Sequence, residues 1–235
     1  MSDYKNIKEL IKIAKLDEYL VEDLNLKKAK VIFVLESPHK DEVFEKNREL
    51  KKKKYPVAGS AGKTMTEVLF PNKGLSFGEI IFKEHQDSRI LKYGVINVSN
   101  IPLQLSSYNF KDLTNSCEIV RYLENTKKND FKKIKNKDLD ENEINERNKI
   151  MKLIGDSFKE RLIPNLDNKL IFLCGNYAEN AFKSIFSENK ISLIDKIENN
   201  IIKITHPSAQ KTDKNDWRNN NRKLIQKAIN DFLGL

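Results

Sequence analysis

Four short and almost uninterrupted apolar runs constrain the fold of this chain more than any other feature. They read KVIFVL, YGVINV, KLIFLC and NIIKIT, at residues 30–35, 93–98, 169–174 and 200–205. Strands with apolar residues at successive positions are buried on both faces, which is typical of a parallel sheet covered by helices. The runs therefore predict a central, four-stranded parallel sheet.

Segments with apolar residues at helical spacing lie between and after these runs. They are KTMTEVLF, SCEIVRYLEN, NEINERNKIMKLIGDSFKERL, YAENAFKSIF and RKLIQKAINDFL. This alternation predicts an α/β fold in which helices cover both faces of the sheet, a three-layer αβα sandwich. No repeat and no Pro-, Gly- or Ser-rich linker marks a boundary, so residues 1–235 are expected to form a single domain.

Two segments are dense in charge. Residues 124–148 have almost no aliphatic side chains before Ile144, and we expect them to form a solvent-exposed insertion. Residues 46–55, KNRELKKKKY, contain four consecutive lysines, for which an exposed loop and a phosphate-binding role both remain open. The net charge of +9 favours a polyanionic partner such as DNA.

Cysteine content and hydropathy limit the cofactors and the cellular location. Cys117 and Cys174 are too few for a four-cysteine zinc or iron–sulfur site, so no cofactor is expected, and both are interpreted as thiols in a reducing compartment. No apolar run approaches the roughly 20 residues that span a bilayer. We therefore expect a cytoplasmic monomer without a membrane partner.

Polar clusters follow all four apolar runs. They are ESPHK (36–40), Asn97 with VSNIPLQ, GNYAEN (175–180) and HPSAQ (206–210). Each cluster alone is consistent with an ordinary turn or strand edge. In a parallel sheet, however, the loops after the strands meet at one edge, where ligands bind. The repeated pattern predicts one shared site, to which Glu36, Asn97 and His206 contribute.

The stretch PVAGSAGKTMTEVL, residues 56–69, is similar to a phosphate-binding loop, G-x-x-x-x-G-K-[ST], but Val57 stands in place of the first glycine. Such a loop follows its strand directly, whereas the first apolar run ends more than twenty residues before Gly59. A phosphate-loop enzyme is therefore an alternative only. Gly59, Gly62 and the helix that follows could still bind a phosphate without hydrolysing it.

The ordered set of motifs resembles the uracil-DNA glycosylase superfamily, from about residue 30 to the C-terminal helix. LESPHKDE and PVAGSAGKTMTEVL are similar to the G-E-A-P-G and P-F-V-G-R-A-G segments of the branch best known from thermophiles. VINV, FLCGNYAENAF and THPS are similar to the base-reading strand, the third strand with its helix, and the motif of the catalytic histidine. The resemblance implies an enzyme that flips a base out of DNA and hydrolyses its N-glycosidic bond.

The resemblance also implies roles for individual residues. Glu36 or Ser37 positions the attacking water, His206 stabilises the departing base, and Asn97 reads the edge of the base. Val57 occupies the position of an aromatic residue that stacks on uracil, a role that Phe77 or Tyr55 could take instead. Candidate DNA contacts are Gly59, Ser60 and Lys63, followed by Ser208, Lys211, Trp217 and Arg218 in the loop after His206. For Trp217, insertion into DNA and packing against the last helix both remain open.

Three departures from the family pattern bear on the substrate. The four cysteines of the thermophile branch are absent, Val57 replaces the stacking aromatic, and Ser37 replaces the usual aspartate or alanine. The substrate is therefore expected to be uracil or a modified cytosine, in repair or in defence against phage DNA. A module of the same fold that binds DNA or a nucleotide without catalysis is the other alternative.

Overall fold

The computed structural model describes residues 4–84, 86–109, 117–133, 140–187, 198–208 and 217–235. Its sheet has four strands, all parallel, in the order β2-β1-β3-β4. Their bounds are β1 (Val31–Leu35), β2 (Tyr93–Asn97), β3 (Leu170–Cys174) and β4 (Ile201–Ile204). Each strand begins and ends within one residue of its predicted bounds. The α/β class and the parallel sheet are thus confirmed.

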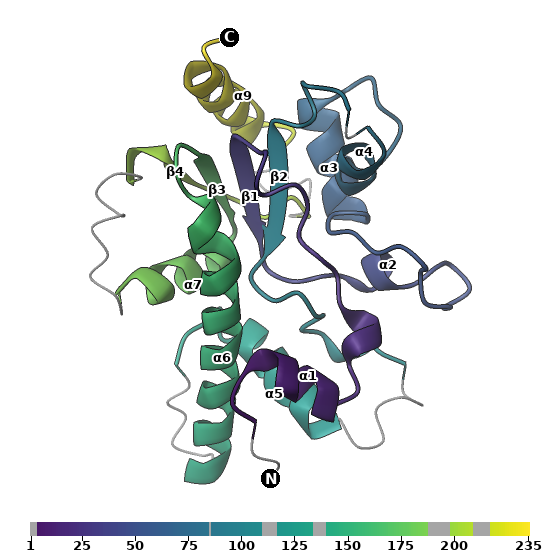
Figure 1. Ribbon diagram of the computed structural model, residues 1–235, viewed down its shortest axis with the longest axis vertical. Helices are drawn as coiled ribbons and strands as arrows, with labels where there is room; N and C mark the ends of the chain where they lie inside the picture. Colours follow the sequence, from purple (N-terminus) through teal and green to yellow (C-terminus); the bar gives the residue numbers. More distant parts are fainter. Residues whose placement is uncertain (1–3, 85, 110–116, 134–139, 188–197, 209–216) are drawn as a thin grey trace.

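Helices precede, connect and follow the strands (Figure 1). The α-helices are α1 (Ile7–Ile13), α2 (Lys40–Val43), α3 (Ser60–Leu69), α4 (Phe77–Lys83), α5 (Cys117–Lys128), α6 (Glu141–Leu162), α7 (Asn176–Ser187) and α9 (Asn220–Leu233). Single 3₁₀ turns cover Asp17–Tyr19, Leu105–Ser107, Ile163–Asn165 and Glu198–Asn200. All five of the helical segments predicted from hydrophobic spacing are present.

Successive side chains of β1 point to opposite faces of the sheet, as the pleat requires. Val31, Phe33 and Leu35 belong to a hydrophobic cluster with α3, α4 and α9. Ile32 and Val34 belong to a second cluster, with α1, α5, α6 and α7. The two groups of helices lie on opposite sides of the sheet (Figure 1), which is the arrangement of a three-layer sandwich.

The strand β4 differs from the sequence expectation of burial on both faces. All residues of β1, β2 and β3 are buried, but Ile201 and Ile202 are only partly buried and Lys203 is exposed. Both β2 and β4 are edge strands, but the outer edge of β2 is covered by a bridge between Leu24 and Val95. Lys203 forms an ion pair with Glu179 of α7.

The charged segment 124–148 is only in part a solvated insertion. Residues 124–128 complete α5, residues 141–148 begin α6, and the side chains of Thr126 and Phe131 are buried. This segment therefore contributes to the helical layer and, through Lys127, to the site described below.

Among the described residues, no helix combines the length and the apolar character needed to cross a membrane.

Candidate active site

Three of the four strand ends converge on one cavity. The register pairs Leu35 with Asn97, so that β1 and β2 end side by side. Glu36 follows β1 directly, Asn97 is the last residue of β2, and His206 comes two residues after β4. All three line a cavity of about 260 Å³, whose other walls come from α2, the turn before α3, and α5. The predicted meeting of Glu36, Asn97 and His206 is therefore present in the structure.

The polar cluster after β3 does not line this cavity. Its Tyr177 is buried, with the hydroxyl group 3.1 Å from Thr126 Oγ1, and its Glu179 forms ion pairs with Lys183 and Lys203. Gly175 instead packs against His206. A Cβ atom added to Gly175 would lie 3.3 Å from the Cβ atom of His206. The sequence expectation that four clusters share the site is thus reduced to three.

The side chain of Asn97 is buried but incompletely hydrogen-bonded. It is 2 % exposed, and its Nδ2 has no hydrogen-bond partner among the described residues. A buried donor left unpaired costs about 1–3 kcal/mol, so such groups in native proteins call for an explanation. Because Asn97 lines the cavity, an acceptor atom of a bound ligand would satisfy Nδ2.

The main chain of Asn97 is held by a residue far away in the sequence. Arg161 Nη2 donates to the main-chain oxygens of Asn97 and Val98, at 2.9 and 2.8 Å. Arg161 Nη1 donates to both carboxylate oxygens of Asp23, at 2.7 and 2.9 Å. These four hydrogen bonds, two from each terminal nitrogen, fix the guanidinium group, which in turn fixes the end of β2.

Glu36 is held by an ion pair inside the cavity. Its Oε1 lies 2.5 Å from Lys127 Nζ, and the hydroxyl group of Ser37 is 3.4 Å from the same oxygen. The side chain of Glu36 is 20 % exposed and that of Lys127 31 %. A carboxylate positioned in this way can orient a water molecule and accept its proton.

The imidazole of His206 is neutral near pH 7. Burial and, to a smaller extent, the positive charge of Lys127 lower its pKa to about 4. The main-chain N–H of Ser208 donates to Nδ1 at 3.2 Å, and the Ser208 hydroxyl lies 2.7 Å from the same atom. Since a main-chain N–H can only donate, Nδ1 is the acceptor and the proton is on Nε2. Nε2 is thus a neutral hydrogen-bond donor.

The turn that precedes α3 forms another wall of the cavity. Val57 is buried with φ of 52°, a left-handed conformation that is strained for a β-branched residue. Two glycines press on this turn, because a Cβ atom at Gly62 would collide with the main-chain oxygen of Val57, and one at Gly78 with that of Pro56. The turn is therefore clamped between α3 and α4, and Gly59 and Ser60 reach the cavity at the N-terminus of α3.

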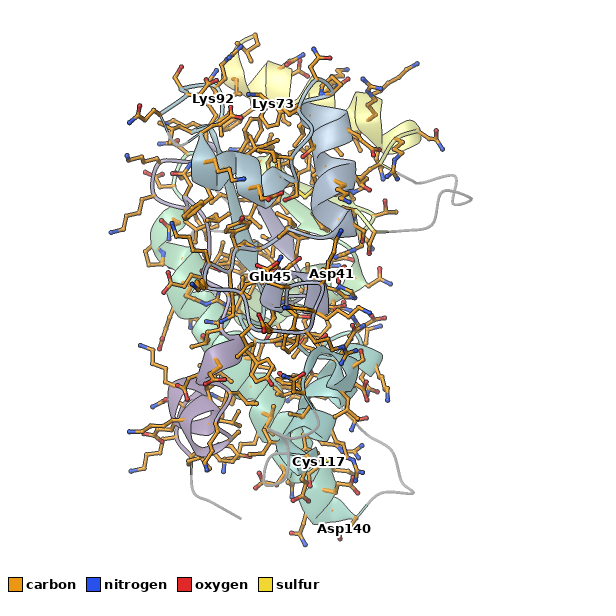
Figure 2. All side chains as sticks on the ribbon, turned by 90° about the vertical axis from the view of Figure 1, so that its right-hand side faces the viewer. Asp41, Glu45, Lys73, Lys92, Cys117 and Asp140 are labelled. Carbon is orange, nitrogen blue, oxygen red and sulfur yellow. The ribbon has the colours of Figure 1, made fainter. Side chains whose placement is uncertain are left out.

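Glu42 of α2 is a buried carboxyl group in the same cavity wall. It is 5 % exposed, and its Oε2 has no hydrogen-bond partner among the described residues. Burial raises its pKa to about 8, although the main-chain N–H groups of His39 and Val57 favour the ionised form. Figure 2 shows its neighbour Asp41 about midway along the molecule, between Lys73 and Lys92 at one end and Cys117 and Asp140 at the other.

Several residues predicted to bind base or DNA lie elsewhere. Phe77 is fully buried in the core, with its ring centroid 5.7 Å from that of Phe33, and does not line the cavity. Tyr55 stacks on Phe82 instead. Trp217 is also fully buried, and its indole N–H donates to the Thr205 oxygen at 2.7 Å. Packing, rather than insertion into DNA, is therefore the role that this structure gives Trp217.

The remaining candidates divide into four groups. Ser37, Val57 and Ser208 line the cavity, whereas Lys63 is exposed on α3. Arg218 pairs with α3, because its Nη2 donates to Thr64 Oγ1 at 2.8 Å and its Nε to Glu67 Oε2 at 2.5 Å. Lys211 lies outside the described residues.

Sequence reasoning missed Lys127, Glu42 and Arg161. Lys127 lies in the segment interpreted as an insertion, and the helical spacing of SCEIVRYLEN just before it was the available signal. Glu42 is the last residue of LESPHKDE (residues 35–42), but its burial depends on the turn at Val57. Arg161 could not be found, because its partners Asp23 and Asn97 are more than sixty residues away.

Comparison of the chain with protein-family models, with curated proteins and with solved structures finds no match. Within the described residues, no group of three or more His, Cys, Asp or Glu side chains is arranged to hold a metal ion. The chemistry of the cavity thus rests on a paired carboxylate, a neutral imidazole, an unpaired amide and a protonatable carboxyl group.

Proposed function

We propose that this protein is a DNA glycosylase that flips a pyrimidine base out of DNA and hydrolyses its N-glycosidic bond. The observation that carries the proposal is the buried, unpartnered Nδ2 of Asn97 in a cavity shared with Glu36 and His206. An asparagine amide offers one donor and one acceptor, which matches the edge of a pyrimidine. The cavity volume, about 260 Å³, lies just below the roughly 300–1,000 Å³ of drug-sized pockets, so it suits a single base.

The proposed reaction uses groups already in place. As the bond from C1′ to the base nitrogen breaks, its electron pair moves onto the base and the sugar becomes positively charged. Nε2–H of His206 donates to the base oxygen on which negative charge develops. Glu36 offsets the charge on the sugar, orients water toward C1′ and accepts its proton. The departing base anion takes up a proton from solvent and Glu36 returns its proton to solvent, so the products are the free base and an abasic site.

Lys127 has a supporting role in this scheme. Its ammonium group pairs with Glu36 and also favours the neutral form of His206. The ion pair holds the Glu36 carboxylate in place, and the positive charge helps to keep the imidazole neutral near pH 7. Lys127 is therefore proposed as a positioning residue.

The substrate is proposed to be uracil or a cytosine with a substituent at position 5. This rests on Val57, whose small aliphatic side chain lines the cavity where the resemblance implies a stacking aromatic. A substituent at position 5 protrudes into the major groove and would mark foreign DNA, which fits antiviral defence. Removal of uracil fits DNA repair.

The deciding experiment is an excision assay on matched duplexes that contain uracil, cytosine, 5-hydroxymethylcytosine or glucosylated 5-hydroxymethylcytosine, followed by alkaline cleavage of abasic sites. We expect strand cleavage with uracil or with a modified cytosine. Lys8→Ala, in an exposed residue of α1, serves as the matched control and should retain activity. DNA binding without cleavage of any duplex would refute catalysis and favour the binding module, and activity on uracil alone would refute the defence role.

A further inference from the structure

We propose that Glu42 is a second base-reading residue: its carboxyl group, in the neutral form, donates a hydrogen bond to an acceptor atom of the base that Asn97 binds. The inference rests on the proposed function and names a specificity contact within it. It is based on a geometric observation. Glu42 and Asn97 are the two polar side chains that line the cavity with more than nine-tenths of their surface buried and with an unpartnered polar atom among the described residues.

The surroundings of Glu42 favour a neutral donor over a carboxylate. Its pKa is raised to about 8 by burial, so the carboxyl group is mostly protonated at pH 7. Lys51 and the main-chain N–H groups of His39 and Val57 oppose this shift, whereas Asp41 adds to it. The other charged or titratable side chains in the same cavity are Glu36, His39, Lys127 and His206. Glu36 and Lys127 form a pair, so neither supplies a counterion for Glu42.

A purely structural role for Glu42 is the competing explanation. Its carboxyl group interacts with the main-chain N–H of Val57 and so supports the strained turn at that residue. That role needs an acceptor, which ionised glutamate, neutral glutamate and glutamine all provide. Only base reading needs a donor, and only base reading is lost when the group ionises. The two roles therefore differ in their pH dependence.

The test measures affinity for two duplexes from pH 6.5 to pH 9. One duplex carries 2′-fluoro-2′-deoxyuridine or 2′-fluoro-2′-deoxycytidine at the target position, because the fluorine suppresses cleavage; the other carries a tetrahydrofuran abasic analogue. The ratio of the two affinities isolates the contribution of the base from general attraction to phosphate. With a pKa of about 8, we expect this ratio to fall about tenfold between pH 6.5 and pH 9.

Two variants complete the test. Glu42→Gln keeps a neutral donor at every pH, so the ratio should become independent of pH. Glu42→Leu removes the donor, so the ratio should be low throughout, and circular dichroism checks that the variant is folded. A ratio that does not change with pH in the parent protein, or the absence of any preference for the base-containing duplexes, overturns the inference.

Failure of this inference can be told apart from failure of the proposed function. If no base is excised but the ratio falls with pH in the parent and not in Glu42→Gln, the base-reading role stands and catalysis is refuted. If a base is excised and the ratio is independent of pH, only the role of Glu42 is refuted.

Discussion

Arg161 fixes Asn97 through the main chain, with Nη2 2.9 Å from the Asn97 oxygen. The Arg161 side chain is 20 % exposed and that of its other partner, Asp23, is 12 % exposed. The amide that faces the cavity is thus positioned by a residue that lies on α6 and does not line the cavity. Loss of Arg161 should therefore affect both folding and base recognition.

Arg161→Met should lower the free energy of unfolding by about 3–5 kcal/mol, because it leaves Asp23 without its partner in a largely buried site. Urea denaturation measures the change. The double variant Asp23→Asn/Arg161→Met should recover part of the loss, since no charge is then left unpaired. Equal stability of the single and double variants would show that the unpaired charge of Asp23 does not cause the loss, which would then be due to the lost hydrogen bonds to Asn97 and Val98.

His206→Ala and Glu36→Gln should each slow base excision about a hundredfold to a thousandfold in single-turnover assays, the usual effect of losing one group that stabilises developing charge. DNA affinity should change little, because these interactions strengthen in the transition state. Lys8→Ala is the control for expression and folding. Unchanged rates in both variants would remove the two residues from catalysis.

Lys127→Met should raise the pKa of His206 from about 4 toward its ordinary value of 6.5, because the nearby positive charge is removed while burial remains. Nuclear magnetic resonance can follow the imidazole directly, since the chain has only three histidines, and His206→Gln assigns the signal. Lys128→Met, one residue further along α5 and paired with Glu124, is the matched control. A pKa that does not move would argue against electrostatic coupling between Lys127 and His206.

His206 should also make the stability of the protein depend on pH. Its folded-state pKa lies below the unfolded value of 6.5, so between about pH 6.5 and pH 4 the unfolded state binds more protons. The free energy of unfolding should fall over this window as the pH is lowered. The fall should be smaller in His206→Gln, when both proteins are compared by urea denaturation at pH 7 and pH 4.5. Parallel pH profiles would contradict a partly buried imidazole that is neutral in the folded state.

DNA affinity should weaken steeply with salt, because bound lysines displace condensed counterions. Lys63→Ala should reduce the slope of log affinity against log salt by about one unit, and replacing Lys211 as well by about two. Lys8→Ala, on α1, should leave the slope unchanged. A parent protein with no salt dependence would instead favour a small-molecule ligand.

The sequence predicted the sheet well, because burial on both faces leaves a clear local signal at the positions of β1, β2 and β3. It also predicted that Glu36, Asn97 and His206 meet, because parallel strands end at one edge of a sheet, but the same rule failed for the cluster after β3. The groups that hold these residues in place were not predictable in the same way. Lys127 and Arg161 reach the site across the helical layer from α5 and α6, and no local pattern encodes those contacts.

For Trp217, the sequence left two roles open that only the structure separates. Its sequence context, between lysines and an arginine, favoured contact with DNA as much as packing. The choice depends on whether a cavity in the core accepts the indole, and the tilted contact with Phe33 together with the hydrogen bond to Thr205 shows that it does. Tertiary fit of this kind leaves no trace in charge or spacing.

The two glycines that press on the turn at Val57 limit how this pocket can evolve. Any side chain at Gly62 or Gly78 would meet main-chain oxygen atoms, which cannot rotate away as a side chain can. The path of the turn is thus fixed by two helices at once, and a descendant of this protein could not shift it by a single substitution. Side chains on the turn are limited by its conformation and burial instead, because Val57 is buried at a φ of 52°. New substrate preferences would therefore arise by exchanging other cavity-lining residues, such as Ser60, on an unchanged backbone.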